Sequence, residues 1–363
     1  MSTVRSSQHR DAKPVLITGG SGFIGCNIAD ALAARGNRVL VLDNLSRYGA
    51  KEHAAWLKER HGDRVEIEVV DVRDAERVNA AVSKASAVLH LAGQVAVTTS
   101  LDEPRADFEI NALGTLNVLE AVRVRNAQAP VLFASTNKVY GRLLDNSSVA
   151  SCGGRYVPAE RHLCKGVAED AVLDFHSPYG CSKGAADQYV RDYARVFGLR
   201  TAVLRMSCIY GPRQFGTEDQ GWIAHFLLQA IQDKPIVIYG DGLQVRDALH
   251  VSDAVAAWIG ALDQIDNIRG GVFNLGGGPG NTVSLLELLD LIAELRGTMP
   301  GVRFAPWRPG DQPWYVSNIQ AISRALGWQP RMNLRAGLQT LEEWLEQRFG
   351  NPLTGVRREK VHA

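Results

Sequence analysis

Gly19-Gly20-Ser21-Gly22-Phe23-Ile24-Gly25 is the stretch that decides the fold, and it connects an apolar segment at Val15–Thr18 to a helical pattern. A strand, a glycine-rich turn and a helix in this order are the context of a dinucleotide-binding fingerprint. The spacing here is GxxGxxG. Gly19 permits the tight turn, Gly22 lets the backbone approach a pyrophosphate at the helix N-terminus, and Gly25 lets helix and strand pack closely.

Strand and helix patterns alternate from residue 14 to residue 205. The further strand segments are residues 38–42, Val65–Val70, Ala87–Ala92, Val131–Ser135 and Thr201–Arg205, with helical stretches at Ala75–Ser83 and Asp107–Arg125. This alternation predicts an α/β fold, a Rossmann-type doubly wound parallel sheet with helices on both faces. The carboxyl ends of its strands meet at one edge, where such sheets bind ligands.

The alternation of strand and helix patterns becomes irregular after residue 205, which predicts a smaller C-terminal substrate-binding domain. Residues 211–247 read as loops around a short strand at Ile236–Tyr239, followed by a strand at Val272–Leu275 and helices at Ser284–Leu295 and Ala336–Phe349. The expected division is a dinucleotide-binding domain over 14–205, a mainly substrate-binding domain over 206–350 with some segments returning to the first, and flexible tails at 1–13 and 351–363.

Composition excludes several classes of function. The 363 residues carry a net charge of +1, so no global field attracts nucleic acid or an anionic membrane. Five cysteines without a CxxC pair predict a reducing compartment and no zinc site. No apolar run reaches membrane-spanning length, and the N-terminus lacks the apolar core of a signal peptide. We therefore expect a cytoplasmic protein that binds no metal, nucleic acid or membrane.

Residues at the strand ends form the expected cofactor site. Asp43 ends the second strand, where a carboxylate accepts both ribose hydroxyls of an adenosine. It also repels a 2′-phosphate, which favours NAD over NADP, although the nearby Arg47 softens this preference. The predicted cofactor-binding residues are Gly19, Gly22, Phe23, Ile24, Gly25, Asp43, Asn44, Ser46, Arg47, Asp71, Val72, Leu91, Ala92, Gly93, Gln94, Tyr179 and Lys183.

Tyr179-Gly180-Cys181-Ser182-Lys183 is the second motif, and Pro178 before it suits a helix N-terminus. Residues four apart share one helix face. An ammonium beside a phenol lowers the pKa of that phenol, so Tyr179 could take a hydroxyl proton while a hydride leaves to a nicotinamide. Lys183 could also hold the nicotinamide ribose. Thr136, at the end of the fifth strand, is expected to hydrogen-bond the reacting oxygen, with Ser135 as the alternative.

Together these motifs resemble the extended short-chain dehydrogenase/reductases, the family of NAD-dependent sugar-nucleotide epimerases and dehydratases. The resemblance implies that Thr136, Tyr179 and Lys183 are the catalytic triad and that Asn111 is a structural asparagine. Within the family, several longer stretches of sequence resemble the CDP-paratose 2-epimerases. They are residues 135–141, 174–189, 213–215, 219–222, 244–247 and 249–250. That similarity implies transient oxidation of the sugar C2 by bound NAD and return of the hydride to the opposite face.

The resemblance also implies a nucleotide-sugar substrate, CDP-linked, and a homodimer or homotetramer. Arg246 and Arg308 are expected on the substrate pyrophosphate because a guanidinium fork matches phosphate oxygens. Without the family context, both would read as surface salt-bridge arginines. The predicted substrate-binding residues are Thr98, Ser135, Asn137, Gln214, Arg246, Arg308 and Asp311.

Three other functions stay open. A 4,6-dehydratase needs an acid–base pair directly after the catalytic threonine, where this chain has Asn137 and Lys138, and an amide cannot shuttle a proton. A UDP-sugar 4-epimerase needs the same triad. A non-catalytic NAD-binding regulator typically lacks the tyrosine or the lysine, and both are present here.

The connection Leu144–His176 is longer than its place between a strand and a helix requires. Connections of this length usually carry function or are disordered. We slightly favour the interpretation that it is a surface excursion over the alternatives that it is a lid or an oligomer contact.

Overall fold

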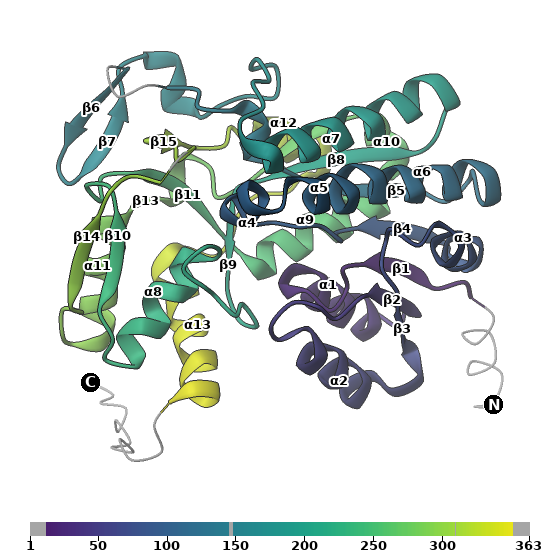
Figure 1. Cartoon of the computed structure of the whole chain (residues 1–363), viewed down its shortest axis with the longest axis horizontal. Coiled ribbons are helices and arrows are strands. Elements are labelled where there is room, and N and C mark those ends of the chain that lie inside the picture. Colours follow the sequence, from purple (N-terminus) through teal and green to yellow (C-terminus); the bar gives the residue numbers. More distant parts are fainter. Residues whose placement is uncertain (1–11, 145–147, 309, 351–363) are drawn as a thin grey trace.

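The computed structural model describes residues 12–144, 148–308 and 310–350, so only residues 12 and 13 of the two predicted tails are included. A seven-stranded sheet with all neighbours parallel forms the centre of this described part (Figure 1). In spatial order its strands are β12 (Val272–Leu275), β8 (Thr201–Met206), β5 (Val131–Thr136), β4 (Ala87–His90), β1 (Val15–Thr18), β2 (Val39–Asp43) and β3 (Val65–Val69).

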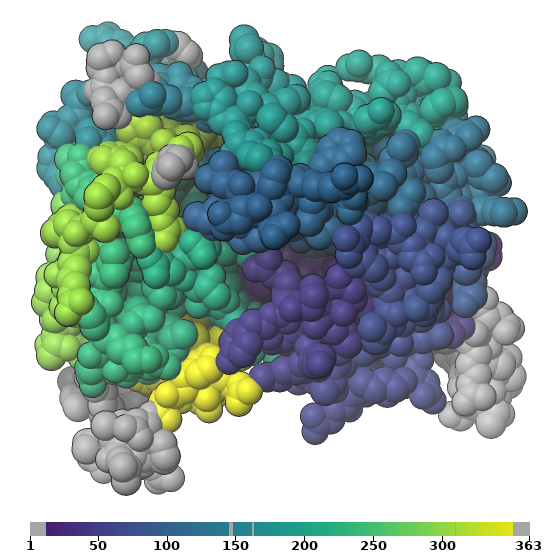
Figure 2. Space-filling view, in the orientation of Figure 1, coloured from purple at the N-terminus to yellow at the C-terminus, as the bar shows by residue number. Residues whose placement is uncertain are grey.

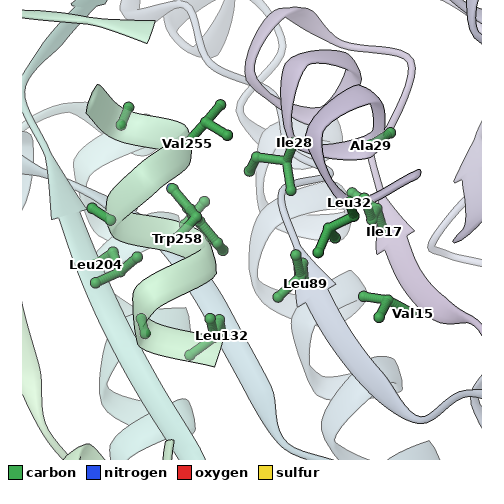
Figure 3. Close-up of a cluster of buried hydrophobic side chains, with 14 of the residues drawn as sticks. Val15, Ile17, Ile28, Ala29, Leu32, Leu89, Leu132, Leu204, Val255 and Trp258 are labelled. Atoms are coloured by element: carbon green, nitrogen blue, oxygen red, sulfur yellow. The ribbon is translucent and has the colours of Figure 1, made fainter. Parts of the chain in front are cut away.

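Helices cover both faces of this sheet, which confirms the predicted doubly wound α/β fold. On one face, Ile28 of α1 (Phe23–Ala34) and Trp258 of α9 (Val251–Asp263) are buried together over strand residues such as Leu89 (Figure 3). Because both faces are buried, the central strands are continuous apolar runs without polar alternation. The opposite face buries a second apolar cluster beneath α3 (Ala75–Lys84), α6 (Gly114–Arg125) and α7 (Ser177–Phe197).

The stretch predicted as one helix over Asp107–Arg125 is divided. It consists of the end of α5 (Pro104–Phe108), a π-helical turn at Glu109–Leu113 and α6. Asn111 lies in the π turn. The other helices of the first half are α2 (Ala50–His61), which was not predicted, and α4 (Val97–Asp102).

The later part of the chain forms smaller sheets beside the main one (Figure 1). Three strands flank the central β11 (Val245–His250), and they are β9 (Cys208–Tyr210), β13 (Thr282–Ser284) and β15 (Trp314–Tyr315). A separate pair is β10 (Ile236–Tyr239) with β14 (Val302–Ala305). Besides α9, the α-helices of this part are α8 (Trp222–Ile231), α10 (Ile265–Ile268), α11 (Leu285–Arg296), α12 (Gln320–Leu326) and α13 (Leu334–Phe349). Interpreting 211–247 as loops around one strand was therefore wrong for α8 and β11.

The long connection Leu144–His176 carries the hairpin β6 (Val149–Cys152) and β7 (Arg155–Pro158), which Figure 1 shows at the upper left. Arg155 at the start of β7 donates to the carboxylate of Glu287 at 2.6 Å. Buried Leu144 and Val167 join a separate apolar cluster with Trp314 and Tyr315. The connection lies at the surface as expected, but it is also built into a core of its own.

Candidate active site

The glycine-rich turn is packed too closely for a side chain at Gly19, Gly20 and Gly25. A Cβ on Gly19, whose φ is +68°, would lie 2.6 Å from the backbone nitrogen of Ala92. A Cβ on Gly25 would lie 2.7 Å from the Cα of Gly20. Gly22 is the N-cap of α1, and no side chain of the described residues caps that end. The free N–H groups and the helix dipole there suit the pyrophosphate of a dinucleotide.

Asp43 forms one wall of the same cleft. Its carboxylate accepts from the backbone N–H groups of Ser21 at 3.0 Å and Leu45 at 2.8 Å, and burial raises its pKa. These two bonds fix the carboxylate while leaving lone pairs for ribose hydroxyls. Every predicted cofactor-binding residue lines this cavity of about 310 Å³. Lining residues that sequence reasoning missed include Ser21, Tyr48, His53, Arg213, Phe215 and Gln220.

Four packed rings, which we call the aromatic roof, lie at this cavity: Tyr48, His53 and Phe215 line it, and Trp344 packs against Phe215. The ring of Phe215 lies 5.2 Å from Tyr48, 5.2 Å from His53 and 5.3 Å from Trp344, between centroids. A Cβ on Gly49, whose φ is +84°, would overlap the Phe215 ring. In Figure 2 the yellow helix α13, which carries Trp344, lies against the purple N-terminal part. The roof therefore joins three distant segments of the chain.

Tyr179 and Lys183 lie in the first turns of α7, where they are only 8% and 4% exposed. Burial raises the pKa of Tyr179 to about 12, against the Thr136 hydrogen bond and the charge of Arg47, which lower it. Burial also lowers the pKa of Lys183 to about 8. From the sequence we expected Lys183 to lower the pKa of Tyr179, but the groups that lower it are Thr136 and Arg47. The structure instead places the Lys183 Nζ 4.3 Å from the ring centroid of Phe133.

A second cavity of about 410 Å³ adjoins the first at Tyr179. Figure 2 shows the surface hollowed where its purple, blue and green parts meet, which are the segments that line both cavities. The second cavity is lined by every residue predicted to bind substrate, namely Thr98, Ser135, Asn137, Gln214, Arg246, Arg308 and Asp311.

Ser135 and Asn137 flank Thr136 at the end of β5. The Ser135 hydroxyl donates to the buried carboxylate of Asp187 at 2.8 Å. The Thr136 hydroxyl donates to the amide oxygen of Asn137 at 3.3 Å and is hydrogen-bonded to Tyr179. Of the two hydroxyls, Thr136 is therefore the one hydrogen-bonded to Tyr179, whereas Ser135 is bonded to Asp187.

Two cations meet in the second cavity. Arg246 donates to the carboxylate of Asp311 at 2.7 Å. Lys138 is close enough for the Arg246 charge to add to the effect of burial, and together they lower its pKa to about 8. Arg308 instead donates to the backbone oxygen of Glu218 at 2.9 Å and to its carboxylate at 3.2 Å. Lys138 is the cation that sequence reasoning missed, although its place directly after Thr136-Asn137 was the available signal.

Three general features complete the description of the site's surroundings. No helix in the described ranges is both long and apolar enough to cross a bilayer. Those same ranges contain no group of three His, Cys, Asp or Glu side chains arranged for a metal ion. The five cysteines are free thiols.

Residues 15–276 match the NAD dependent epimerase/dehydratase family. The chain belongs to this family. It is 43% identical over 337 residues to the CDP-paratose 2-epimerase of Salmonella typhi, which covers 91% of this chain and 98% of that protein. The UDP-glucose 4-epimerase of Thermotoga maritima, solved with UDP-glucose, has a TM-score of 0.80 at 29% identity and covers 92% and 99% of the two chains. The Thermus thermophilus UDP-glucose 4-epimerase, solved with NAD, has a TM-score of 0.78 at 33% identity with the same coverage.

These matches confirm the family, the epimerase class and NAD as the cofactor that the sequence predicted. They also fit the geometry, because the glycine-rich turn lines the first cavity at the N-terminus of α1 and Asp43 stands in the same cavity where a ribose is expected. In this family member the residues that would hold NAD are therefore the glycine-rich turn, Asp43, the segment Leu91–Gln94 and Lys183.

We predict that the aromatic roof retains NAD. Replacing Phe215 with alanine removes the ring on which the other three pack, and we expect bound NAD to leave at least about tenfold faster, because 1.4 kcal/mol of lost contact gives that factor. Release from the purified holoenzyme is followed as nucleotide lost during buffer exchange. Phe304→Ala, at a residue 62% exposed on β14, is the matched control. Equal release from Phe215→Ala and the unchanged chain would refute a retaining roof.

Proposed function

We propose that this enzyme epimerises C2 of CDP-paratose, or of a close analogue, through a 2-keto sugar. The observation that carries the proposal is 43% identity along almost the whole chain to the CDP-paratose 2-epimerase of Salmonella typhi. The site supports it, because Thr136, Tyr179 and Lys183 meet at the junction of the cofactor cavity and the second cavity.

The side chains divide the chemistry among them. Tyr179 takes the proton of the sugar hydroxyl, and Thr136, hydrogen-bonded to that phenol, holds the reacting oxygen. Lys183 supplies a positive charge on the same helix face. NAD, when bound, supplies the acceptor and then the donor of the hydride. The second cavity holds the keto sugar beside Tyr179 until Tyr179 returns the proton.

Arg246 and Lys138 are the groups that we propose for the substrate diphosphate. Their positive charges lie in the second cavity, and the Asp311 carboxylate fixes the orientation of Arg246. A planar guanidinium and a compact ammonium match the separate oxygens of two phosphate groups.

Asn137 and Lys138 argue against the dehydratase alternative. Elimination of water needs an acid and a base beside the threonine, and here the adjacent side chains are an amide and an ammonium. The presence of Thr136, Tyr179 and Lys183 together argues against a non-catalytic regulator. A 4-epimerase uses the same triad, so substrate turnover has to separate it from a 2-epimerase.

The purified enzyme should be assayed with CDP-paratose, UDP-glucose and UDP-N-acetylglucosamine. We expect turnover of CDP-paratose, with a product that carries no solvent deuterium at C2 when made in deuterated water, because the hydride returns to the carbon it left. Turnover of only a UDP-sugar at C4 would refute the 2-epimerase proposal. Deuterium at C2 would indicate enolisation instead.

A further inference from the structure

Asp107 is a buried acid that sequence analysis did not single out. It lies on α5, and its exposed fraction is 0%. Its carboxylate accepts one hydrogen bond from the Ser182 hydroxyl and another, at 3.2 Å, from the Asn111 amide. The same amide donates to the Ser182 hydroxyl at 3.0 Å, so the three side chains form a closed triangle. Burial raises the pKa of the Asp107 carboxyl, while the two donors and the Lys183 charge act against burial and favour the charged form.

This triangle is attached to both halves of the active site. Ser182 lies between Tyr179 and Lys183 in the first turns of α7, and its hydroxyl is 3.2 Å from the backbone oxygen of Tyr179. Asn111 pairs twice with the backbone of Gln94, which lines the cofactor cavity, at 3.1 and 2.9 Å. A change in the triangle would therefore reach the catalytic turn and the floor of the cofactor cavity together.

We propose that Asp107 is a positioning residue for the Tyr179–Lys183 pair. The Asp107 carboxylate fixes the turn of α7 between the two residues and supplies a negative charge that faces the Lys183 ammonium. The inference rests on the proposed function, because it assigns Tyr179 as the base. No contact between Asp107 and the substrate is required, since Asp107 acts through Ser182 and through its charge.

The charges around the pair come from several elements. Burial lowers the pKa of Lys183, and Asp107 on α5 and Asp187 on α7 both raise it. Asp107 also raises the pKa of the tyrosine, whereas Arg47 on the loop after β2 lowers it. His90 on β4 is neutral near pH 7, because burial and then the Lys183 charge lower its pKa to about 3. Among the described residues, Asp107 is thus the one carboxylate whose charge raises the pKa of both members of the pair.

The direction of the pH effect follows from these signs. Activity needs Tyr179 deprotonated, which sets the acid limb of the pH profile, and Lys183 protonated, which sets the alkaline limb. A carboxylate raises the pKa of both groups. Loss of the Asp107 charge should therefore move both limbs to lower pH, by about one unit for one nearby charge.

Asp107→Asn tests this with little change of shape, because the amide oxygen can still accept from Asn111 and the amide nitrogen can donate to Ser182. We expect the whole bell-shaped profile of kcat/KM to move acidward by about one pH unit. Asp102→Asn, at an exposed acid on the neighbouring α4, is the matched control and should leave the profile in place. A lower profile with unmoved limbs would mean that Asp107 is only structural, and would overturn the proposal.

A second measurement separates this inference from the proposed function. Phenolate absorbance of the NAD-loaded holoenzyme is titrated with pH, and the same curve from a Tyr179→Phe variant is subtracted. The Tyr179 midpoint should fall in Asp107→Asn whichever sugar is the substrate. If CDP-paratose does not turn over but the midpoint falls, the substrate assignment fails and the role of Asp107 stands. An unchanged midpoint overturns the role of Asp107 alone.

Discussion

Replacing Tyr179 with phenylalanine lowers kcat by about 10²- to 10⁴-fold, which is the usual contribution of a positioned acid–base group, while NAD remains bound. The substitution deletes one oxygen from a ring that is 8% exposed, so the packing of α7 is kept. The phenol that takes and returns the hydroxyl proton is lost, and Thr136 loses its hydrogen-bond partner. Turnover of CDP-paratose and the NAD content of the purified protein are the two measurements.

The matched control for Tyr179→Phe is Tyr189→Phe. Tyr189 lies on the same helix but is 47% exposed, so deletion of its hydroxyl should leave turnover within about twofold. If Tyr179→Phe kept full turnover, another group would have to be the base. If it lost NAD as well as turnover, the phenol would be holding the cofactor, and the activity loss could not be assigned to proton transfer.

The parts of the fold that could be predicted are those set by neighbours in sequence. The glycine-rich turn, the apolar strands of the main sheet and the start of α7 around Pro178 are each determined by local sterics and periodicity. The cofactor site followed from them, because parallel strands bring Asp43 and Leu91–Gln94 to one edge. The proposed catalytic triad needed one further step, namely that Thr136 and α7 meet across that edge.

The parts that could not be predicted depend on distant partners. β11 does not read as a strand because it carries Arg246 and Asp247, and these charges are buried only because Asp311 and Ser207 come from elsewhere in the chain. α8 begins after Gly221, without a polar side-chain cap, and sits among residues that read as loop. Asp107 lies in a predicted helical stretch, but nothing local distinguishes a buried acid from a solvated one until α5 packs on α7.

Arg205→Met should reduce the free energy of unfolding by about 3–5 kcal/mol, the cost of leaving a buried charge unpaired. Arg205 on β8 is 1% exposed, and it donates to both oxygens of the fully buried Asp187 at 2.9 and 3.0 Å. It also donates to the Tyr140 hydroxyl at 3.0 Å. Denaturant titration, followed by fluorescence, measures the change. Arg200→Met is the control, since its partner Asp266 is 73% exposed and such surface pairs contribute about 0–1 kcal/mol.

The double variant Arg205→Met with Asp187→Leu decides why the single variant is unstable. If the cost comes from the stranded Asp187 carboxylate, removal of that carboxylate should recover most of the lost stability, because a buried ion pair is often replaceable by apolar side chains. Ser135 would lose its acceptor in the double variant, so recovery stays incomplete. A double variant as unstable as the single one would contradict the stranded-charge explanation and place the cost in the contact between Arg205 and Tyr140. The pair also joins β8 to α7, and Asp187 raises the pKa of Lys183, so recovered stability with lost turnover would show that the pair serves the active site as well as stabilising the fold.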